Sequence, residues 1–249
     1  MVMDQDLTAR NAGRPGLRPL YQQVRDLFRA RISSGAWRPA EALPSEQSLA
    51  AELGVSQGTV RKALDSLAAD NLVERRQGKG TFVTQHTAES AHFRFFKLCG
   101  DDGERVLPAC KSATIARRAA SREERRALDL SPRVYVYEIT RTRFIEEQPT
   151  LRETIVVSAA QFPNLDAHQP LPNTLYTFYQ AQYGVSIVRA GERLRAVAAD
   201  KADARAFGVA EGAPLLEAER IAFDLDRAPV ERRVSRYLTD GLHYAADMA

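Results

Sequence analysis

Residues 44–83 read PSEQSLAAELGVSQGTVRKALDSLAADNLVERRQGKGTFV. Ser45 precedes apolar residues at helical spacing, so we expect its side chain to cap a short helix. Gly54 suits the left-handed position that ends such a helix, and Ser56 is placed to cap a second one. This stretch therefore predicts two short helices joined by a tight turn.

The second predicted helix has two different faces. Its apolar stripe follows i, i+3, i+4, i+7 spacing and consists of Val60, Ala63, Leu64 and Leu67. Its polar front turn contains Gln57, Gly58, Thr59, Arg61 and Lys62. An apolar back with a polar leading turn is the arrangement that lets a recognition helix reach base edges in a DNA major groove.

A basic hairpin follows the helix pair. Asn71 is expected to stop the second helix, and residues 72–73 and 81–83 are predicted as strands. RRQGKG at residues 75–80 joins them; its glycines permit a tight turn and its cations can meet phosphates or the minor groove. The whole stretch predicts a winged helix-turn-helix. An ordinary helical hairpin with a solvated basic loop is the structural alternative.

Composition agrees with a DNA-binding module near the N-terminus. The 249 residues suggest one large or two ordinary domains. Residues 1–84 carry a net charge of +3, whereas residues 85–249 balance to zero. Cys99 and Cys110 suggest no disulfide framework, and no stretch reads as a signal peptide or membrane span, so we expect a cytoplasmic protein.

The pattern along the chain predicts an α+β protein of two domains. We interpret the segments as a disordered tail (1–16), a winged helix-turn-helix DNA-binding domain (17–84), a linker (85–93) and a domain built around an antiparallel sheet (94–249). The apolar face of a first helix is predicted to comprise Leu20, Val24, Leu27, Phe28 and Ile32. In the last domain we predict strands at 111–117, 134–144, 150–157, 185–199, 214–224 and 230–238. Short helices are predicted at 121–128, 174–183 and 201–207.

One segment of the last domain has an internal echo. LDLSPRVYVYEITRTRF (128–144) aligns without a gap to FGVAEGAPLLEAERIAF (207–223), which pairs Arg141 with Arg220. Each copy follows a short charged helix and leads to a turn containing proline and another strand. This repeat predicts two related half-domains in a pseudo-symmetric sheet, with chance similarity of helix–turn–strand units as the alternative.

The residues at this point resemble a known family. LPSEQSLAAELGVSQGTVRKALDSLAADNLVERRQGKGTFV is similar to the DNA-binding signature of the GntR family of bacterial transcriptional regulators. LYTFYQAQYGVSIVRAGERLRAV and FDLDRAPVERRVSRY resemble the UTRA ligand-sensing domain of the HutC-type branch, whose fold is similar to chorismate lyase. The resemblance covers residues 18–245 and implies a homodimeric repressor that a small metabolite releases from DNA. Two such modules on a twofold axis would read a palindromic operator.

Base contacts are expected from the front of the second helix. Arg61 can bind guanine and Gln57 can bind adenine with two hydrogen bonds each. Gln47, Gln57 and Gly58 depart from residues that the family often carries, so its usual operator sequence cannot be transferred. The remaining DNA-binding candidates, several of them suited to phosphates, are Ser45, Gly58, Thr59, Lys62, Arg75, Gln77, Gly78 and Lys79.

An anion is the predicted effector. Arg141 and Arg143 share one face of a predicted strand, and an anion would relieve the repulsion between their guanidinium groups. They match the strand arginines that contact a phosphate or carboxylate in sugar-phosphate-sensing relatives. The resemblance also implies that Glu153 and Glu231 accept hydrogen bonds from the effector. Thr174, which opens a helix, and Tyr237 complete the predicted set. The alternative for the two arginines is pairing with carboxylates on an exposed sheet face.

Two other functions remain open from the sequence. One is an enzyme with a chorismate-lyase-like domain, although His86, His92, His168 and His243 lack metal-ligand spacing and no nucleophile motif occurs. The other is a non-specific DNA-binding protein without an effector. An aminotransferase-like sensor is excluded by the chain length. We expect no cofactor, no metal and no membrane partner.

Overall fold

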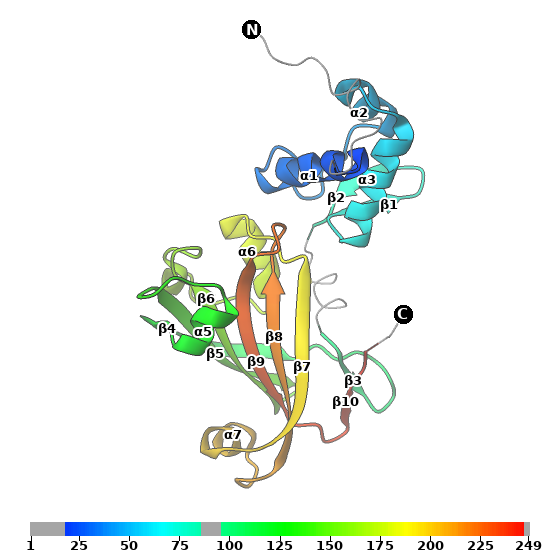
Figure 1. The fold of residues 1–249 in the computed structure, drawn as a ribbon. Helices are drawn as coiled ribbons and strands as arrows, with labels where there is room; N and C mark the ends of the chain where they lie inside the picture. The colour runs from blue at the N-terminus through cyan, green and yellow to red at the C-terminus, as the bar shows by residue number, and fades with distance from the viewer. Residues whose placement is uncertain (1–17, 86–95, 247–249) are drawn as a thin grey trace. The chain divides into compact units, whose positions relative to one another are not determined.

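The computed structural model describes residues 18–85 and 96–246. The chain divides into two compact units, residues 1–85 and 86–249, which we describe separately (Figure 1). The predicted tail and, apart from Gln85, the predicted linker lie outside the described residues. So do His86 and His92.

The N-terminal unit is a three-helix core with a two-stranded wing. Its elements are α1 (Leu20–Ser33), α2 (Glu46–Leu53), α3 (Gln57–Ala69), β1 (Val73–Arg76) and β2 (Gly80–Val83). The predicted stripe of α3 is buried, and α1 packs on this helix. The prediction for Leu27 is wrong, because its side chain is 40% exposed. The buried stripe of α1 follows i, i+4, i+8 spacing and consists of Val24, Phe28 and Ile32.

The C-terminal unit contains one large antiparallel sheet with the strand order β4-β5-β6-β9-β8-β7. Its strands are β4 (Ala109–Ala119), β5 (Tyr135–Ile145), β6 (Gln148–Ser158), β7 (Arg189–Ala198), β8 (Pro214–Phe223) and β9 (Pro229–Tyr237). The helices are α5 (Arg122–Ala127), α6 (Leu175–Tyr183) and α7 (Lys201–Phe207), with a 3-10 turn at Leu165–Ala167. All six strands and all three short helices therefore occur near their predicted positions, as an α+β fold requires.

Two features of this unit differ from the sequence-based expectation. β3 (Leu98–Gly100) and β10 (Leu242–Tyr244) form a separate antiparallel pair that was not predicted. Strands of three residues are too short to show an alternating pattern. β7 begins at Arg189 rather than residue 185, because the preceding residues form an irregular segment that buries Ile187 in the main core.

The predicted internal repeat corresponds to the two halves of the sheet. In each half a strand, a short helix and two further strands follow in the same order, β4-α5-β5-β6 and β7-α7-β8-β9. β6 and β9 pair at the centre, so the halves meet about a pseudo-twofold axis (green strands beside yellow-to-red strands in Figure 1). The helices α5 and α7 both begin with a capping box, at Ser121 and Asp200 respectively.

The main core lies between one face of this sheet and α6. Leu175, Tyr176 and Tyr179 of α6 pack there with apolar residues of β5, β6, β8 and β9. Farther along the same strands the apolar residues give way to arginine and glutamate, and the candidate effector residues lie among these charged side chains.

Candidate functional site

The turn between α2 and α3 is held by side-chain caps at both helix starts. Ser45 Oγ accepts from the Ser48 N–H at 3.1 Å, and Ser56 Oγ accepts from the Thr59 N–H at 3.2 Å. Gly54 closes α2 with a φ of 63°, a conformation that glycine adopts without strain. These two caps and the conformation of Gly54 confirm the local predictions. They fix the first turn of α3, which carries the predicted base-reading side chains.

The front of α3 carries Gln57 and Arg61, one helical turn apart and both exposed. Both donate to Glu46, the first residue of α2: Gln57 Nε2 at 3.3 Å and Arg61 Nε at 2.9 Å, each to Oε2. Arg75 of the wing donates from Nη2 to Oε1 of the same carboxylate at 3.2 Å. Hydrogen bonding from Arg61 lowers the pKa of Glu46. Sequence reasoning did not select Glu46.

The other predicted DNA contacts are spread over the same unit. Ser45, Gln47 and Gly58 are exposed at or near the starts of α2 and α3, and Thr59 is half-buried. The Lys62 ammonium lies 4.3 Å from the centre of the Tyr21 ring, and Arg75 also pairs with Asp65 at 2.7 Å. The exposed tip of the wing consists of Gln77, Gly78 and Lys79.

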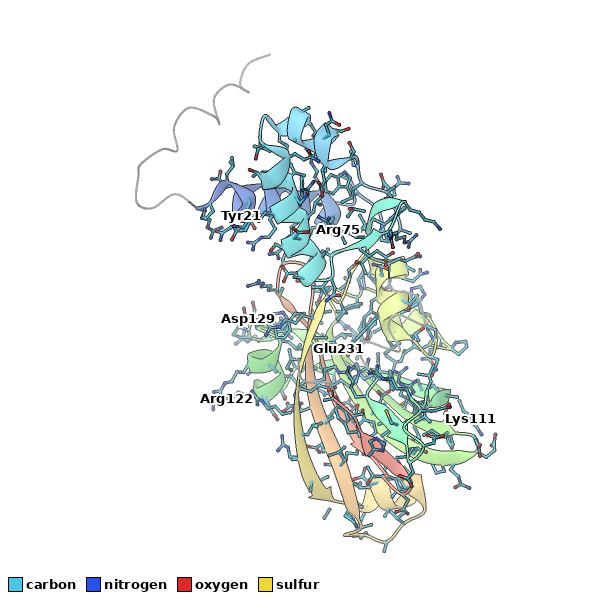
Figure 2. All side chains as sticks on the ribbon, turned by 90° about the vertical axis from the view of Figure 1, so that its right-hand side faces the viewer. Tyr21, Arg75, Lys111, Arg122, Asp129 and Glu231 are labelled. Atoms are coloured by element: carbon cyan, nitrogen blue, oxygen red, sulfur yellow. The ribbon has the colours of Figure 1, made fainter. Side chains whose placement is uncertain are left out.

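The C-terminal unit contains a set of charged side chains that we call the buried charge cluster: Arg141, Arg143, Glu153, Glu231 and Arg233. None of these residues is more than 5% exposed, so the two predicted arginines do not lie on an exposed sheet face. The other part of that alternative, pairing with a neighbouring carboxylate, holds for Arg141, which pairs with Glu153. Figure 2 shows Glu231 amid the side chains of the sheet, whereas Lys111, on the edge strand β4, lies at the margin of the sheet.

Glu153 lies at the centre of the cluster. It accepts from Arg141 Nε at 2.5 Å and from Arg233 Nη1 at 3.0 Å. Burial alone would raise the pKa of Glu153, but the neighbouring guanidinium groups outweigh this effect and hold the pKa well below its usual range. The carboxylate is therefore ionised whenever the protein is folded near neutral pH.

Arg143 is fully buried and incompletely paired. Nε and Nη2 donate to the Pro108 carbonyl, at 3.1 and 2.5 Å, and Nη2 also donates to Asn173 Oδ1 at 3.1 Å. Nη1 has no hydrogen-bond partner, and its distance of 3.8 Å to Glu153 Oε2 is too long for one. Burial lowers the pKa of Arg143 to about 10, so this unsatisfied group still carries its charge at neutral pH.

Glu231 and Arg233 form the second half of the cluster. Glu231 accepts from the hydroxyls of Tyr176 and Tyr179 at 2.9 and 3.0 Å, and from Arg233 Nε at 3.0 Å. Tyr237 is buried on the same strand. The two tyrosines of α6 and Arg233 were not predicted as site residues. Arg233 could have been found, because it lies two residues from Glu231 and so shares its face of the strand.

Asn173 and Thr174 connect the cluster to the start of α6. The Asn173 carbonyl accepts from Arg141 Nη1 at 3.3 Å, and its side chain accepts from the Cys110 N–H at 2.9 Å. Thr174 is the N-cap residue of α6, but its side chain makes no capping hydrogen bond. The cluster thus lies beside a helix start, as predicted, although Asn173 makes the contacts rather than Thr174.

The cluster holds three cations and two carboxylates. Arg220, the counterpart of Arg141 in the other half, is also buried but pairs with Glu192 at 2.6 Å and adds no further excess. One buried positive charge therefore remains uncompensated, next to the unpartnered Nη1 of Arg143. A site with a surplus cation and a free donor is suited to an anion.

Each of the two units matches a known protein family or domain. The family model for bacterial regulatory proteins of the gntR family matches residues 20–83, and the UTRA domain model matches residues 104–243. The chain belongs to the gntR family and carries a UTRA domain. Members of this family are transcriptional regulators, so the enzyme reading is wrong and DNA binding is the function of the N-terminal unit.

Relatives of this gntR-family protein include two repressors. It is 30% identical over 200 residues to the histidine utilization repressor of Pseudomonas aeruginosa, with 80% of this chain and 79% of the relative covered. It is 27% identical over 229 residues to the mannosyl-D-glycerate transport/metabolism system repressor MngR of Escherichia coli, with 90% and 94% covered. The resemblance to HutC-type repressors is thereby confirmed.

Solved structures support the fold. A ligand-binding domain from Bordetella bronchiseptica, described as that of a GntR-family transcriptional regulator, aligns with a TM-score of 0.58 and 32% identity over 63% of this chain and 98% of that one. PhnF from Mycobacterium smegmatis aligns with a TM-score of 0.54 and 23% identity over 91% and 99% of the two chains, and it supports the fold alone.

Residues 18–85 and 96–246 contain no candidate membrane span and no candidate metal site. No helix there is long and apolar enough to cross a bilayer. Within the same ranges no group of three or more histidine, cysteine, aspartate or glutamate side chains is arranged to hold a metal ion.

Proposed function

We propose that this gntR-family protein is a homodimeric repressor in the cytoplasm that binds a palindromic operator and is released by a small anionic metabolite. Operator binding is assigned to α3 and the wing, and effector binding to the buried charge cluster. The main support for an anionic effector is Arg143 Nη1, a fully buried charged donor that has no hydrogen-bond partner and lies in a cluster with surplus positive charge.

An anion at Arg143 would change contacts that already exist. Two of the Arg143 nitrogens now donate to a neutral carbonyl and a neutral amide, of Pro108 and Asn173. Carboxylate or phosphate oxygens are stronger acceptors, so the effector would compete for the guanidinium group. Both displaced groups belong to segments that flank the cluster, the loop before β4 and the start of α6.

The names of relatives agree with this chemistry. They refer to histidine, mannosyl-D-glycerate and fructoselysine, and each of these compounds carries a carboxylate. Glu153 and Glu231 would then accept from hydroxyl or amine groups elsewhere on the effector. We therefore propose a small carboxylate or phosphate that also carries hydrogen-bond donors.

A homodimer is proposed because one module can read only a few base pairs. Two copies of α3 on a twofold axis would meet half-sites about 10 base pairs apart. The test is footprinting of the full chain on DNA selected from a random pool. Protection should be twofold symmetric, and sedimentation should show a dimer. A monomer on and off DNA, or an asymmetric footprint, contradicts the dimer proposal.

The effector proposal is tested by a thermal-shift screen of the full chain with carboxylates, phosphorylated sugars and neutral sugars. Anions should raise the melting temperature and lower operator affinity together, and neutral analogues should do neither. If neutral compounds are as effective as their charged analogues, the anion assignment is wrong. If no compound changes operator affinity while binding stays sequence-specific, the protein has no effector in the set, and the DNA-binding half of the proposal stands alone.

A further inference from the structure

Glu46 makes contacts that its position does not require. It is the first residue of α2, where an acidic side chain stabilises the helix N-terminus without any partner. Yet its carboxylate also accepts from Gln57 and Arg61 of α3 and from Arg75 of the wing. These three donors come from the two elements that are expected to touch DNA.

The contact with Arg61 leaves one particular edge of the guanidinium group for DNA. Arg61 Nε and Nη2 both lie 2.9 Å from Glu46 Oε2, so the carboxylate binds the edge nearest the side-chain stem. The outer edge, formed by Nη1 and Nη2, keeps two parallel N–H groups. That edge matches guanine O6 and N7. Glu46 thus holds the side chain in a pose that can read a base.

A carboxylate on this surface also has an electrostatic consequence. Arg61 and Arg75 have half-exposed side chains and would attract any DNA phosphate. Glu46 offsets part of that charge and repels the backbone itself. Glu46 therefore weakens binding to DNA of random sequence, which depends on charge alone. The position in which it holds Arg61 favours binding to an operator, which depends on contacts with bases.

We propose that Glu46 is a positioning residue for sequence recognition, which orients Arg61 and Gln57 toward bases and suppresses binding to DNA of random sequence. This inference rests on the proposed operator recognition by α3. It predicts that the ratio of operator affinity to random-DNA affinity depends on both the charge and the length of this side chain.

The first test replaces the charge at constant size. The Glu46→Gln variant of the full chain is titrated with an operator selected from a random pool and with a scrambled duplex, across a range of salt concentrations. We expect at least about a fivefold loss on the operator, the lower end of what one bidentate base contact supplies. The scrambled duplex should bind as tightly or more tightly, with a salt slope steeper by about one phosphate contact.

Glu52→Gln is the matched control. Glu52 lies on the same helix, but its ion pair is with Arg31 of α1 rather than with α3 or the wing. The variant loses the same charge, so it should alter affinity for both duplexes alike and leave their ratio unchanged. If Glu46→Gln also leaves the ratio unchanged, the proposed role of Glu46 is overturned.

The second test separates positioning from helix stabilisation. Glu46→Asp keeps the negative charge at the start of α2 but shortens the side chain by one methylene. A residue that acts only on the helix would keep wild-type operator affinity in this variant, and that result overturns the proposal. A positioning residue should lose operator affinity while binding to the scrambled duplex stays at the wild-type level.

A double-mutant cycle shows whether Glu46 acts through Arg61. On an Arg61→Ala background, Glu46→Gln should cause a smaller loss on the operator than it does in the wild-type protein, because only its effect through Gln57 remains, whereas independent contributions would add. Additive losses contradict the proposal, and circular-dichroism melts of every variant show whether the fold is retained. If the wild-type protein itself does not distinguish operator from scrambled DNA, the proposed repressor function fails instead.

Discussion

Glu153 and Arg233 occupy equivalent positions in the two halves of the sheet and are bound to each other, Arg233 Nη1 to Glu153 Oε1, at 3.0 Å. The equivalence follows from the strand register. Arg141 faces Glu153 across β5 and β6, and its counterpart Arg220 faces Arg233 across β8 and β9. An acid in one half is thus matched with a base in the other, on the two central strands.

Glu153→Gln is predicted to destabilise the C-terminal unit by about 3–5 kcal/mol, because it leaves buried guanidinium groups without their carboxylate. Unfolding should be followed by circular dichroism or calorimetry. The single tryptophan, Trp37, lies in the N-terminal unit and does not report on this sheet. The exposed Glu147, which pairs with Lys111, is the control, and Glu147→Gln should have little effect. Equal stability of the two variants would show that Glu153 is dispensable.

Arg143→Met is predicted to abolish the response to an anionic effector without lowering the stability of the protein. The methionine fills the buried space without an uncompensated charge, so the free energy of unfolding should stay the same or rise by up to about 2 kcal/mol. The thermal shift caused by an anionic effector should disappear, because the unpartnered donor is gone. Arg133→Met, at an exposed arginine of the same unit, should keep the full shift. A variant at position 143 that still responds contradicts the effector assignment.

Arg61→Ala is predicted to reduce operator affinity about tenfold or more, and to reduce random-DNA affinity much less. The reason is that a base contact is lost in one complex and only a phosphate attraction in the other. Gel shifts at fixed salt concentration measure both. Lys62→Ala provides the comparison, because Lys62 lies over Tyr21 and is expected to contact phosphates. Its loss should weaken both complexes equally; equal losses for Arg61→Ala would refute direct readout.

The C-terminal unit is predicted to become less stable at acid pH, because protonation of Glu124 weakens its contact with Arg118. Hydrogen bonding from Arg118 lowers the pKa of Glu124 from 4.5 to about 2. The interaction therefore contributes fully above pH 4.5 and is lost as the pH falls through about 2. We expect a contribution of about 1 kcal/mol after solvent screening, since Arg118 is partly exposed.

The measurement compares wild-type protein with the Glu124→Gln variant from about pH 5 downward, at constant ionic strength. The difference in melting temperature between them should shrink steadily toward pH 2. A difference that stays constant over this range would mean that the Arg118 contact does not contribute to stability.

The fold of the N-terminal unit was predictable because the sequence patterns that define it are local. Ser45, Gly54 and Ser56 act within four residues of their own positions, and the α3 stripe is defined by spacing along one helix. Glu46 was missed for the opposite reason. Its partner Arg75 is 29 residues away, and no sequence period connects a helix start to a wing.

In the C-terminal unit, too, local features could be predicted from the sequence and long-range contacts could not. Its strands and helices followed from alternation and from capping residues, and the repeat correctly indicated two halves. The repeat also paired Arg141 with Arg220, but sequence alone could not show that Arg220 is compensated by Glu192 while Arg143 is not. The tyrosines of α6 read as ordinary core residues, and only tertiary packing brings their hydroxyls to Glu231.

Phe96 is the first described residue after the segment that joins the two units, and the centre of its ring lies 4.3 Å from the Arg143 guanidinium carbon. The first described residue of the C-terminal unit therefore contacts the cation that we propose as the binding partner of the effector. An effector bound at Arg143 would therefore act directly on Phe96. The effect of a bound effector on Phe96 would not have to pass through the sheet.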